Sequence, residues 1–224
     1  MHALHALVLA RKVLYLGISD APAWVVAKAN EYARCNALTP FCVYQGRWSI
    51  LDRSFERDII PMARDEGIAL APWSVLGGGK IRTDAEEERR KQSGEGGNSF
   101  YTSEWLRTPQ EKAVCDALEK VAGEVGAKHI NSVAIAYVMQ KTQFVFPIIG
   151  GRKVEQLVTN LEALEIALSD EQIAFLDAAS PIDLGFPHSM IGDGSTNGML
   201  NSSTGHVDFW PRAQPIKPSR KAEV

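Results

Sequence analysis

The chain lacks the features that mark membrane-spanning and nucleic-acid-binding proteins. No apolar run approaches the ~20 residues that a transmembrane helix requires. Its 24 basic and 27 acidic side chains leave a formal net charge of −3, so there is no basic surplus to attract a phosphate backbone. We therefore expect neither a membrane nor a nucleic acid among its partners.

Cysteine is also scarce. Cys35, Cys42 and Cys115 are odd in number and lack the CxxC or His-paired spacing of a metal site. We interpret them as reduced, structural thiols and expect a cytoplasmic protein. Residues 1–12 are too short and too weakly charged at their start for a signal peptide, and are typical of the last turns of an amphipathic helix. A chain that opens in a helix suggests a truncated domain.

What the sequence does contain is a strand–loop–helix unit that occurs four times. Its 224 residues, 45% of them hydrophobic, can bury one sizeable core. The β-rich segments are 13–19, 41–46, 68–73 and 144–149, and helical patterns are expected over 24–35, 53–66, 109–125, 131–141 and 153–165 and from 169. Such units predict parallel strands, whose carboxyl ends gather ligand-binding groups. Four units are half of an eight-fold barrel.

Local signals refine these helices. Gly67 is a C-cap glycine, Asn131-Ser132 are cap candidates, and Ser169 with Gln172 forms a capping box. The periodicity of 24–35 predicts four core-facing side chains: Val25, Val26, Ala29 and Tyr32.

Two stretches carry no clear periodicity. The loop 80–108 is long enough to be either functional or disordered, and its charge run 84–91 favours a solvated short helix over a binding patch. The tail from Pro181 onward is rich in Gly, Ser, Asn and Pro. We expect it to wrap the surface or to be disordered, particularly beyond His206.

Polar side chains at the predicted strand ends form a candidate dinucleotide site. Ser19, Asp20 and Gln45 offer donors and acceptors suited to a planar carboxamide, and Trp73 offers a flat ring face at the same level. After the third strand, the glycine loop 77–79 allows close approach to a pyrophosphate, and positive charge follows in Lys80.

The fourth loop adds groups suited to a terminal phosphate. Arg152 and Lys153 stand at the start of a helix, where a guanidinium and the helix N-terminus together favour an anion. Gln156 and Asn160 lie four residues apart on that helix, so their amides should share one face. In order, these features match an extended nicotinamide dinucleotide phosphate.

Each feature has a plainer alternative. A serine at a strand end is commonly a helix cap, a triple glycine a flexible loop, Trp73 a core residue and Arg152 a surface charge. Only their joint position after successive strands favours a cofactor site.

Several motifs resemble those of the aldo-keto reductases, most closely the fungal aryl-alcohol dehydrogenase and norsolorinic acid reductase branch. They lie in 13–20, 44–45, 71–79, 147–161 and 185–193, so the resemblance covers nearly all of 1 to about 193. It implies a TIM barrel that binds NADP(H), here reduced to about its last four β/α units in 1–193, with an irregular tail over 194–224.

The resemblance also implies a role for each candidate residue. Ser19, Asp20 and Gln45 would hold the carboxamide, and Trp73 would stack on the nicotinamide. The remaining contacts would follow the cofactor from its pyrophosphate to its adenosine: Ser74, Leu76 and Gly78, then Gly150, Arg152, Gln156 and Asn160.

The catalytic set of that family, a tyrosine, a lysine, an aspartate and a histidine, comes from strands that precede this part of the barrel. Tyr15 and Tyr44 lie in predicted strands without a Lys–Asp pair at the family's spacing. His2 and His5 lie on the opening helix, where surface or barrel-packing roles are favoured. The histidines His129, His188 and His206 have no matching partners. We therefore assign no catalytic residue.

Two hypotheses about function follow. The first is an NADP(H)-dependent oxidoreductase of aryl aldehydes, aryl alcohols or related small carbonyl compounds. The alternative is a non-catalytic remnant that binds a dinucleotide weakly or associates with a full-length relative. Because a half-barrel exposes two strand edges, we also expect a homodimer or pairing with a second half-barrel.

Overall fold

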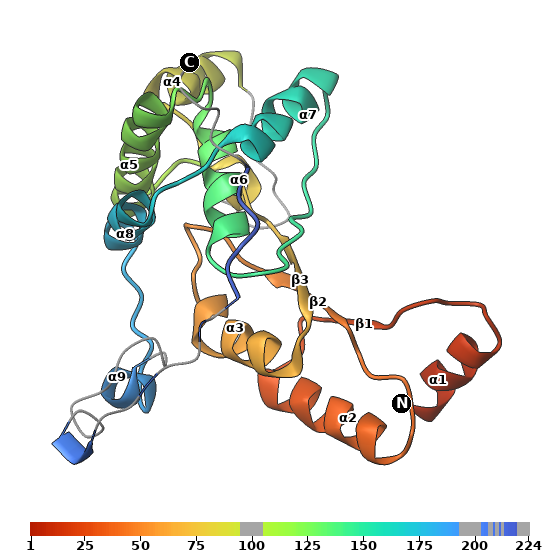
Figure 1. The fold of residues 1–224 in the computed structure, drawn as a ribbon. Helices are drawn as coiled ribbons and strands as arrows, with labels where there is room; N and C mark the ends of the chain where they lie inside the picture. Colours follow the sequence, from red (N-terminus) through yellow and green to blue (C-terminus); the bar gives the residue numbers. More distant parts are fainter. Residues whose placement is uncertain (95–104, 193–202, 206–207, 209–210, 212, 219–224) are drawn as a thin grey trace, which may run out of the picture.

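A computed structural model describes residues 1–94, 105–192, 203–205, 208, 211 and 213–218 (Figure 1). Along the chain its helices and strands are α1 (His2–Leu9), β1 (Gly17–Ser19), α2 (Ala23–Cys35), β2 (Val43–Arg47), α3 (Phe55–Glu66), β3 (Ala69–Trp73), the 3₁₀ turn η1 (Gly77–Gly79), α4 (Asp84–Ser93), α5 (Pro109–Val125), α6 (Ile130–Gln140), α7 (Val154–Leu161), η2 (Glu162–Glu165), α8 (Asp170–Ala179) and α9 (His188–Ile191). The expected strand–helix alternation is present in its first three units.

The sheet is parallel, in the order β1-β2-β3. Its register places Ser19 opposite Gln45 and Arg47 opposite Trp73. The ladder of β1 is only three residues long, shorter than the predicted 13–19, and Leu14 is 78% exposed. In the described part of the chain β1 pairs only with β2, so the residues before it have no second neighbour to extend the ladder.

The predicted fourth strand, 144–149, does not form a regular strand: Phe144 has φ 55°, and Val145 forms an isolated parallel bridge with Leu70. It runs parallel to β3, with Leu70 N donating to Phe144 O (2.9 Å) and Phe146 N donating to Leu70 O (2.7 Å). Farther along, Ile148 N donates to Pro72 O at 2.8 Å. Pro72 has no N–H to return a bond to this segment, which interrupts the ladder. A parallel fourth segment therefore lies beside β3.

The helix α2 lies beside α3 along the sheet (Figure 1), and its predicted core face is confirmed at Val26, whereas Val25 and Ala29 are only half-buried. Its buried residues are Val26, Asn30 and Ala33, whereas Tyr32 is 47% exposed. The prediction of Tyr32 as a core residue was wrong, because the helix buries Asn30 and Ala33 instead. Asn30 is satisfied by the backbone of Phe41: it donates to Phe41 O (3.1 Å) and accepts from Phe41 N (2.8 Å).

The helices α5, α6 and α8 form a second group, with α7 against α6 (Figure 1). The capping box at the start of α8 is confirmed, with Ser169 Oγ accepting from Gln172 N at 3.2 Å. The caps predicted for α6 were wrong, because the helix begins at Ile130 with His129 as its N-cap. Ser132 instead reaches the next helical segment, 2.7 Å from a Glu162 carboxylate oxygen and 2.9 Å from the Thr159 carbonyl oxygen.

The tail contains more structure than its composition predicted. It forms the short helix α9. Residues 213–218 return to the fold, where Lys217 Nζ donates to Leu168 O at 2.8 Å just before α8. Much of the segment beyond His206 lies outside the described residues. In the part that is described, no helix combines the length and the apolar character needed to cross a bilayer.

Two glycines provide a test of the core around β2. A Cβ added at Gly46 would lie 2.7 Å from both the Phe55 and Tyr44 rings, whereas one added at Gly123, inside α5, meets nothing within 4 Å. We predict that Gly46→Ala lowers the free energy of unfolding by about 1–3 kcal/mol through overpacking. We predict that Gly123→Ala raises it by about 0.5–1 kcal/mol through helix propensity. Urea unfolding measures both; equal effects of the two substitutions would contradict the packing.

Candidate functional site

Three of the predicted cofactor residues meet through hydrogen bonds at the carboxyl end of the sheet. The Asp20 carboxylate accepts from Ser19 Oγ at 2.7 Å and from Trp73 Nε1 at 3.1 Å. The backbone N–H of Asp20 donates to Gln45 O at 2.9 Å, and Gln45 stands opposite Ser19 in the register. The structure therefore brings the ends of β1 and β3 together around the Asp20 carboxylate, and β2 bonds to the backbone of the same residue.

The residues that directly follow two of these strands have a backbone conformation that L-residues rarely adopt. Asp20 follows β1 with φ 51°, and Ser74 follows β3 with φ 58°. Asp is enriched in the left-handed region among non-glycine residues, whereas Ser is not. Such strain costs of order 1–3 kcal/mol and clusters at ligand sites. Its occurrence at the ends of β1 and β3 marks this edge as the candidate functional site.

The loop after β3 is a tight turn whose glycines are required by geometry. Gly77 has φ 59°, and a Cβ there would lie 2.7 Å from Leu51 Cδ1. The turn uses its own amides, because Gly77 N donates to Ser74 O (2.8 Å) and Gly79 N donates to Leu76 O (3.1 Å). These two N–H groups are thus engaged within the turn that the sequence assigned to a pyrophosphate.

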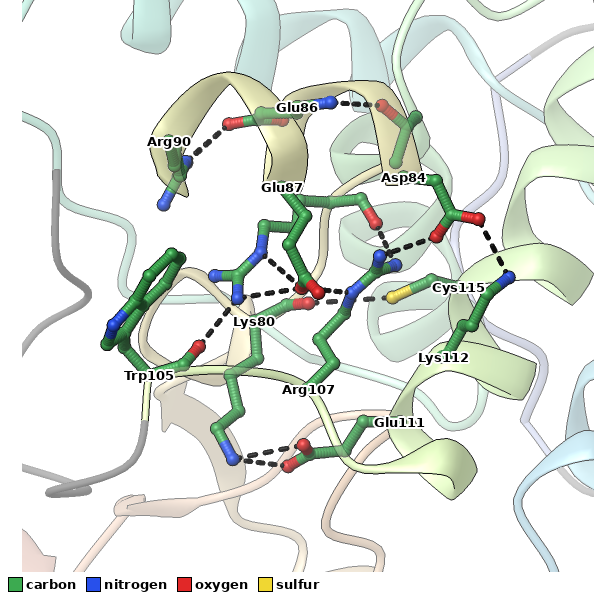
Figure 2. A network of polar contacts seen from close by, with 12 residues as sticks. Lys80, Asp84, Glu86, Glu87, Arg90, Trp105, Arg107, Glu111, Lys112 and Cys115 are labelled. Atoms are coloured by element: carbon green, nitrogen blue, oxygen red, sulfur yellow. Dashed lines mark hydrogen bonds and ion pairs between the residues drawn. The ribbon is translucent and has the colours of Figure 1, made fainter. Parts of the chain in front are cut away.

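Lys80 points its charge into the fold rather than toward the strand ends. Its Nζ pairs with both carboxylate oxygens of Glu111, at 2.8 and 3.0 Å (Figure 2). Glu111 is also part of the capping box of α5, through Thr108. The cation predicted for the pyrophosphate therefore holds the start of α5 against the glycine turn.

A buried ionic network closes the base of the loop 80–108 (Figure 2). The side chains of Arg82 and Arg107, 0% and 3% exposed, both donate to Glu87 Oε2, at 3.0 and 2.7 Å. Arg82 also donates to the carbonyls of Gly79 (3.0 Å) and Trp105 (2.6 Å). The network joins the glycine turn to the far end of the loop.

This network alters the interpretation of the charge run. The expected short helix is confirmed as α4, but it is not simply solvated, because Glu87 points inward between the two arginines. Burial raises the pKa of Glu87, and the hydrogen bonds from Arg107 and Arg82 outweigh burial, so that its pKa is lowered overall. Sequence periodicity could not find this arrangement, since the partners lie 5 and 20 residues away.

The residues predicted to contact the adenosine end of the cofactor differ in whether their side chains are exposed to a ligand. The segment that leads to Gly150 runs beside β3, so Gly150 and Arg152 emerge at the same edge of the sheet as Trp73. Gln156 Oε1 accepts from Arg152 N (2.7 Å) and Lys153 N (3.2 Å), which caps α7. Gln156 is exposed and Asn160 is buried, so the two amides do not form one open surface.

A tyrosine, a lysine and an aspartate do meet elsewhere in the fold. Tyr137 Oη donates to Asp177 Oδ1 at 2.5 Å, and Lys141 Nζ lies 2.7 Å from Asp177 Oδ2. They belong to a buried cluster with Arg53 and Glu56 that ties α3, α6 and α8 together. Burial, followed by the charges of Glu56 and Asp177, raises the pKa of Tyr137. A proton donor needs the opposite shift, so this cluster is structural.

Comparison with known proteins is consistent with this geometry. The model of the "Aldo/keto reductase family" matches residues 1–181. The chain belongs to the aldo-keto reductase family. The resemblance seen in the sequence is thereby confirmed.

The individual relatives that it resembles include fungal proteins. It is 58% identical over 221 residues to an aryl-alcohol dehydrogenase (NADP+) of Phanerodontia chrysosporium, a match that covers 98% of this chain and 57% of the relative. It is 42% identical over 231 residues to norsolorinic acid reductase B of Dothistroma septosporum, again with 98% and 57% coverage. This aldo-keto reductase chain thus spans 57% of the length of these two relatives.

The shared carboxylate of the ionic network gives a test of how the loop is held. We predict that Glu87→Gln lowers the free energy of unfolding by about 3 kcal/mol at neutral pH, because the buried Arg82 loses its carboxylate partner and, among the described carboxylates, the buried Arg107 keeps only the exposed Asp84. The lowered pKa of Glu87 means that its contribution is present above its ordinary value of 4.5 and is lost as the pH falls through the lowered pKa. The difference between wild type and variant should therefore shrink under acid conditions.

Urea unfolding at neutral and acid pH measures this difference. Glu88→Gln, which neutralises an exposed carboxylate on the same helix, is the matched control and should change little. A pH-independent difference for Glu87→Gln would contradict the ionic role of the carboxylate.

Proposed function

We propose that this chain provides the cofactor-binding part of an NADP(H)-dependent oxidoreductase that acts on aryl aldehydes, aryl alcohols or related carbonyl compounds. The observation that supports it most is the hydrogen-bonded group of Ser19, Asp20 and Trp73 at the strand ends. The name of the 58% identical relative, an aryl-alcohol dehydrogenase (NADP+), supports the cofactor and the substrate class.

The chemistry of the donor set fits the proposed cofactor. A hydroxyl, a carboxylate and an amide side chain at adjacent strand ends suit a carboxamide, and the indole of Trp73 offers a face for a flat ring. Bound NADPH would supply a hydride, while these residues orient the ring and exclude water. We further propose that the proton donor comes from outside residues 1–224, because the Tyr137 cluster is buried and its pKa is raised.

The alternative is a non-catalytic remnant that binds a dinucleotide. It shares the proposed cofactor site but carries out no carbonyl reduction. It is supported by the same strand-end group and by the engagement of Lys80 with Glu111. Steady-state turnover of an aromatic aldehyde with NADPH by the chain itself, abolished by Trp73→Ala, would exclude the remnant. We predict no such turnover for the chain alone.

Arg152 provides a test of the cofactor itself. Its side chain is exposed at the edge where the strands end. The backbone N–H of Arg152 donates to Gln156, whereas its guanidinium has no hydrogen-bond partner among the described residues. We predict that Arg152→Ala weakens NADPH binding about tenfold and leaves NADH nearly unchanged, because only NADPH carries the 2′-phosphate. Titration calorimetry measures both, with Lys28→Ala as an exposed-cation control. Equal loss for NADPH and NADH would contradict the phosphate role.

We also propose that the sheet is completed by the other half of an aldo-keto reductase barrel. Apolar side chains are exposed at both outer segments: Leu14 and Tyr15 before β1, and Phe146 and Ile148 beside β3. Parallel sheets are normally covered on their faces and paired at their edges, and a wet apolar face costs roughly 25 cal/mol per Å². Relatives that are longer than this chain have residues to fill that position.

Co-expression with the part of the Phanerodontia chrysosporium relative that this chain does not align with tests the pairing. We predict that the two polypeptides co-purify and that the complex, unlike the chain alone, reduces an aromatic aldehyde with NADPH. Phe146→Lys should weaken the association, whereas Met190→Lys, at an exposed apolar residue of α9, should not. A stable homodimer that excludes the added polypeptide would refute this proposal.

A further inference from the structure

The carboxylate at the centre of the strand-end group is electrostatically uncompensated. Asp20 accepts hydrogen bonds from two neutral donors, the Ser19 hydroxyl and the Trp73 indole. Among the described residues it takes part in no ion pair, and Arg47, at the end of β2, is paired with Asp52 at 3.0 Å. One full negative charge therefore remains at the strand ends.

Neighbouring groups respond to this charge. Tyr44 lies on β2, and its hydroxyl donates to the Ala21 carbonyl at 2.7 Å. Burial raises the pKa of Tyr44, and the negative charge of Asp20 raises it further. The carboxylate thus acts on groups beyond the two that it binds.

We propose that Asp20 makes this site select the oxidised form of the dinucleotide, NADP+, over NADPH. This inference rests on the proposed function. The two forms share their phosphates, riboses and adenine, and they differ in the nicotinamide ring, which carries a positive charge only when oxidised. A carboxylate hydrogen-bonded to the indole of Trp73 acts on that charge and leaves the rest of the cofactor unaffected.

The backbone supports the choice of a neutral variant. Asp20 has φ 51°, a region in which Asn is tolerated as well as Asp. Asn keeps an oxygen that accepts from Trp73 Nε1, so Asp20→Asn removes the charge and preserves the contact. Asp20→Gly is a second neutral variant, which relaxes the same backbone angle.

Titration calorimetry of the chain with NADP+ and with NADPH tests the inference. In the wild type we expect tighter binding of NADP+. In Asp20→Asn the ratio of the NADPH to the NADP+ dissociation constant should fall about threefold to tenfold, as expected for unit charges several ångströms apart in a polar site. Asp65→Asn, which removes an exposed carboxylate from α3, should leave the ratio unchanged.

The outcomes separate this inference from the proposed function. Suppose that the chain binds NADP+ and NADPH, and that it prefers NADPH to NADH in a way that depends on Arg152. If Asp20→Asn then leaves the ratio of the NADPH to the NADP+ dissociation constant unchanged, the inference fails and the proposed function stands. If the chain binds neither form, both fail. Circular dichroism verifies the fold of each variant. If Asp20→Asn does not fold, the ratio in Asp20→Gly decides between the same two results.

Discussion

Everything at the candidate site depends on the parallel register of the sheet. Because the segments run in one direction, their carboxyl ends come to one edge, although residues 19, 45 and 73 are far apart in the sequence. The hydrogen bonds that continue past the strand ends fix this alignment. Asp20 N donates to Gln45 O, and Ile148 N donates to Pro72 O. An antiparallel segment in the same position would carry its loop residues to the opposite edge.

The loop beyond β3 shows how such an edge is stiffened. The glycine turn adopts positive φ angles, and Arg82 donates to the carbonyl of Gly79 from a buried position. Burying Arg82 and Arg107 carries a desolvation cost, which Glu87 offsets by bonding to both and Asp84 offsets further by bonding to Arg107. A turn next to the candidate site is thereby held by charges as well as by the apolar packing of Val75 and Ile81.

Local signals in the sequence predicted the parts of this fold that local physics determines. The alternation of strands and helices, the capping box of Ser169 and the strand-end position of Ser19, Asp20 and Trp73 follow from periodicity and from short-range hydrogen bonding. The partners of long-range pairs could not be predicted in this way. Lys80 bonds to Glu111, and Asn30 bonds to Phe41, because the fold brings these residues together. The residues around Lys80 and Asn30 in the sequence do not indicate which distant group each of them will bind.

The open edges of the sheet and the proposed cofactor site are physically linked. The first strand-end groups, Ser19 and Asp20, follow one outer segment, and Gly150 and Arg152 follow the other. Any neighbour that pairs with these outer segments restrains the loops that carry the candidate site residues. A polypeptide that binds the edges and a dinucleotide that binds the strand ends would each favour the same ordered sheet, so each would strengthen the binding of the other. On the proposal that a dinucleotide binds at the strand ends, a neighbour at the sheet edges would change cofactor affinity without any of the exposed apolar side chains contacting the cofactor.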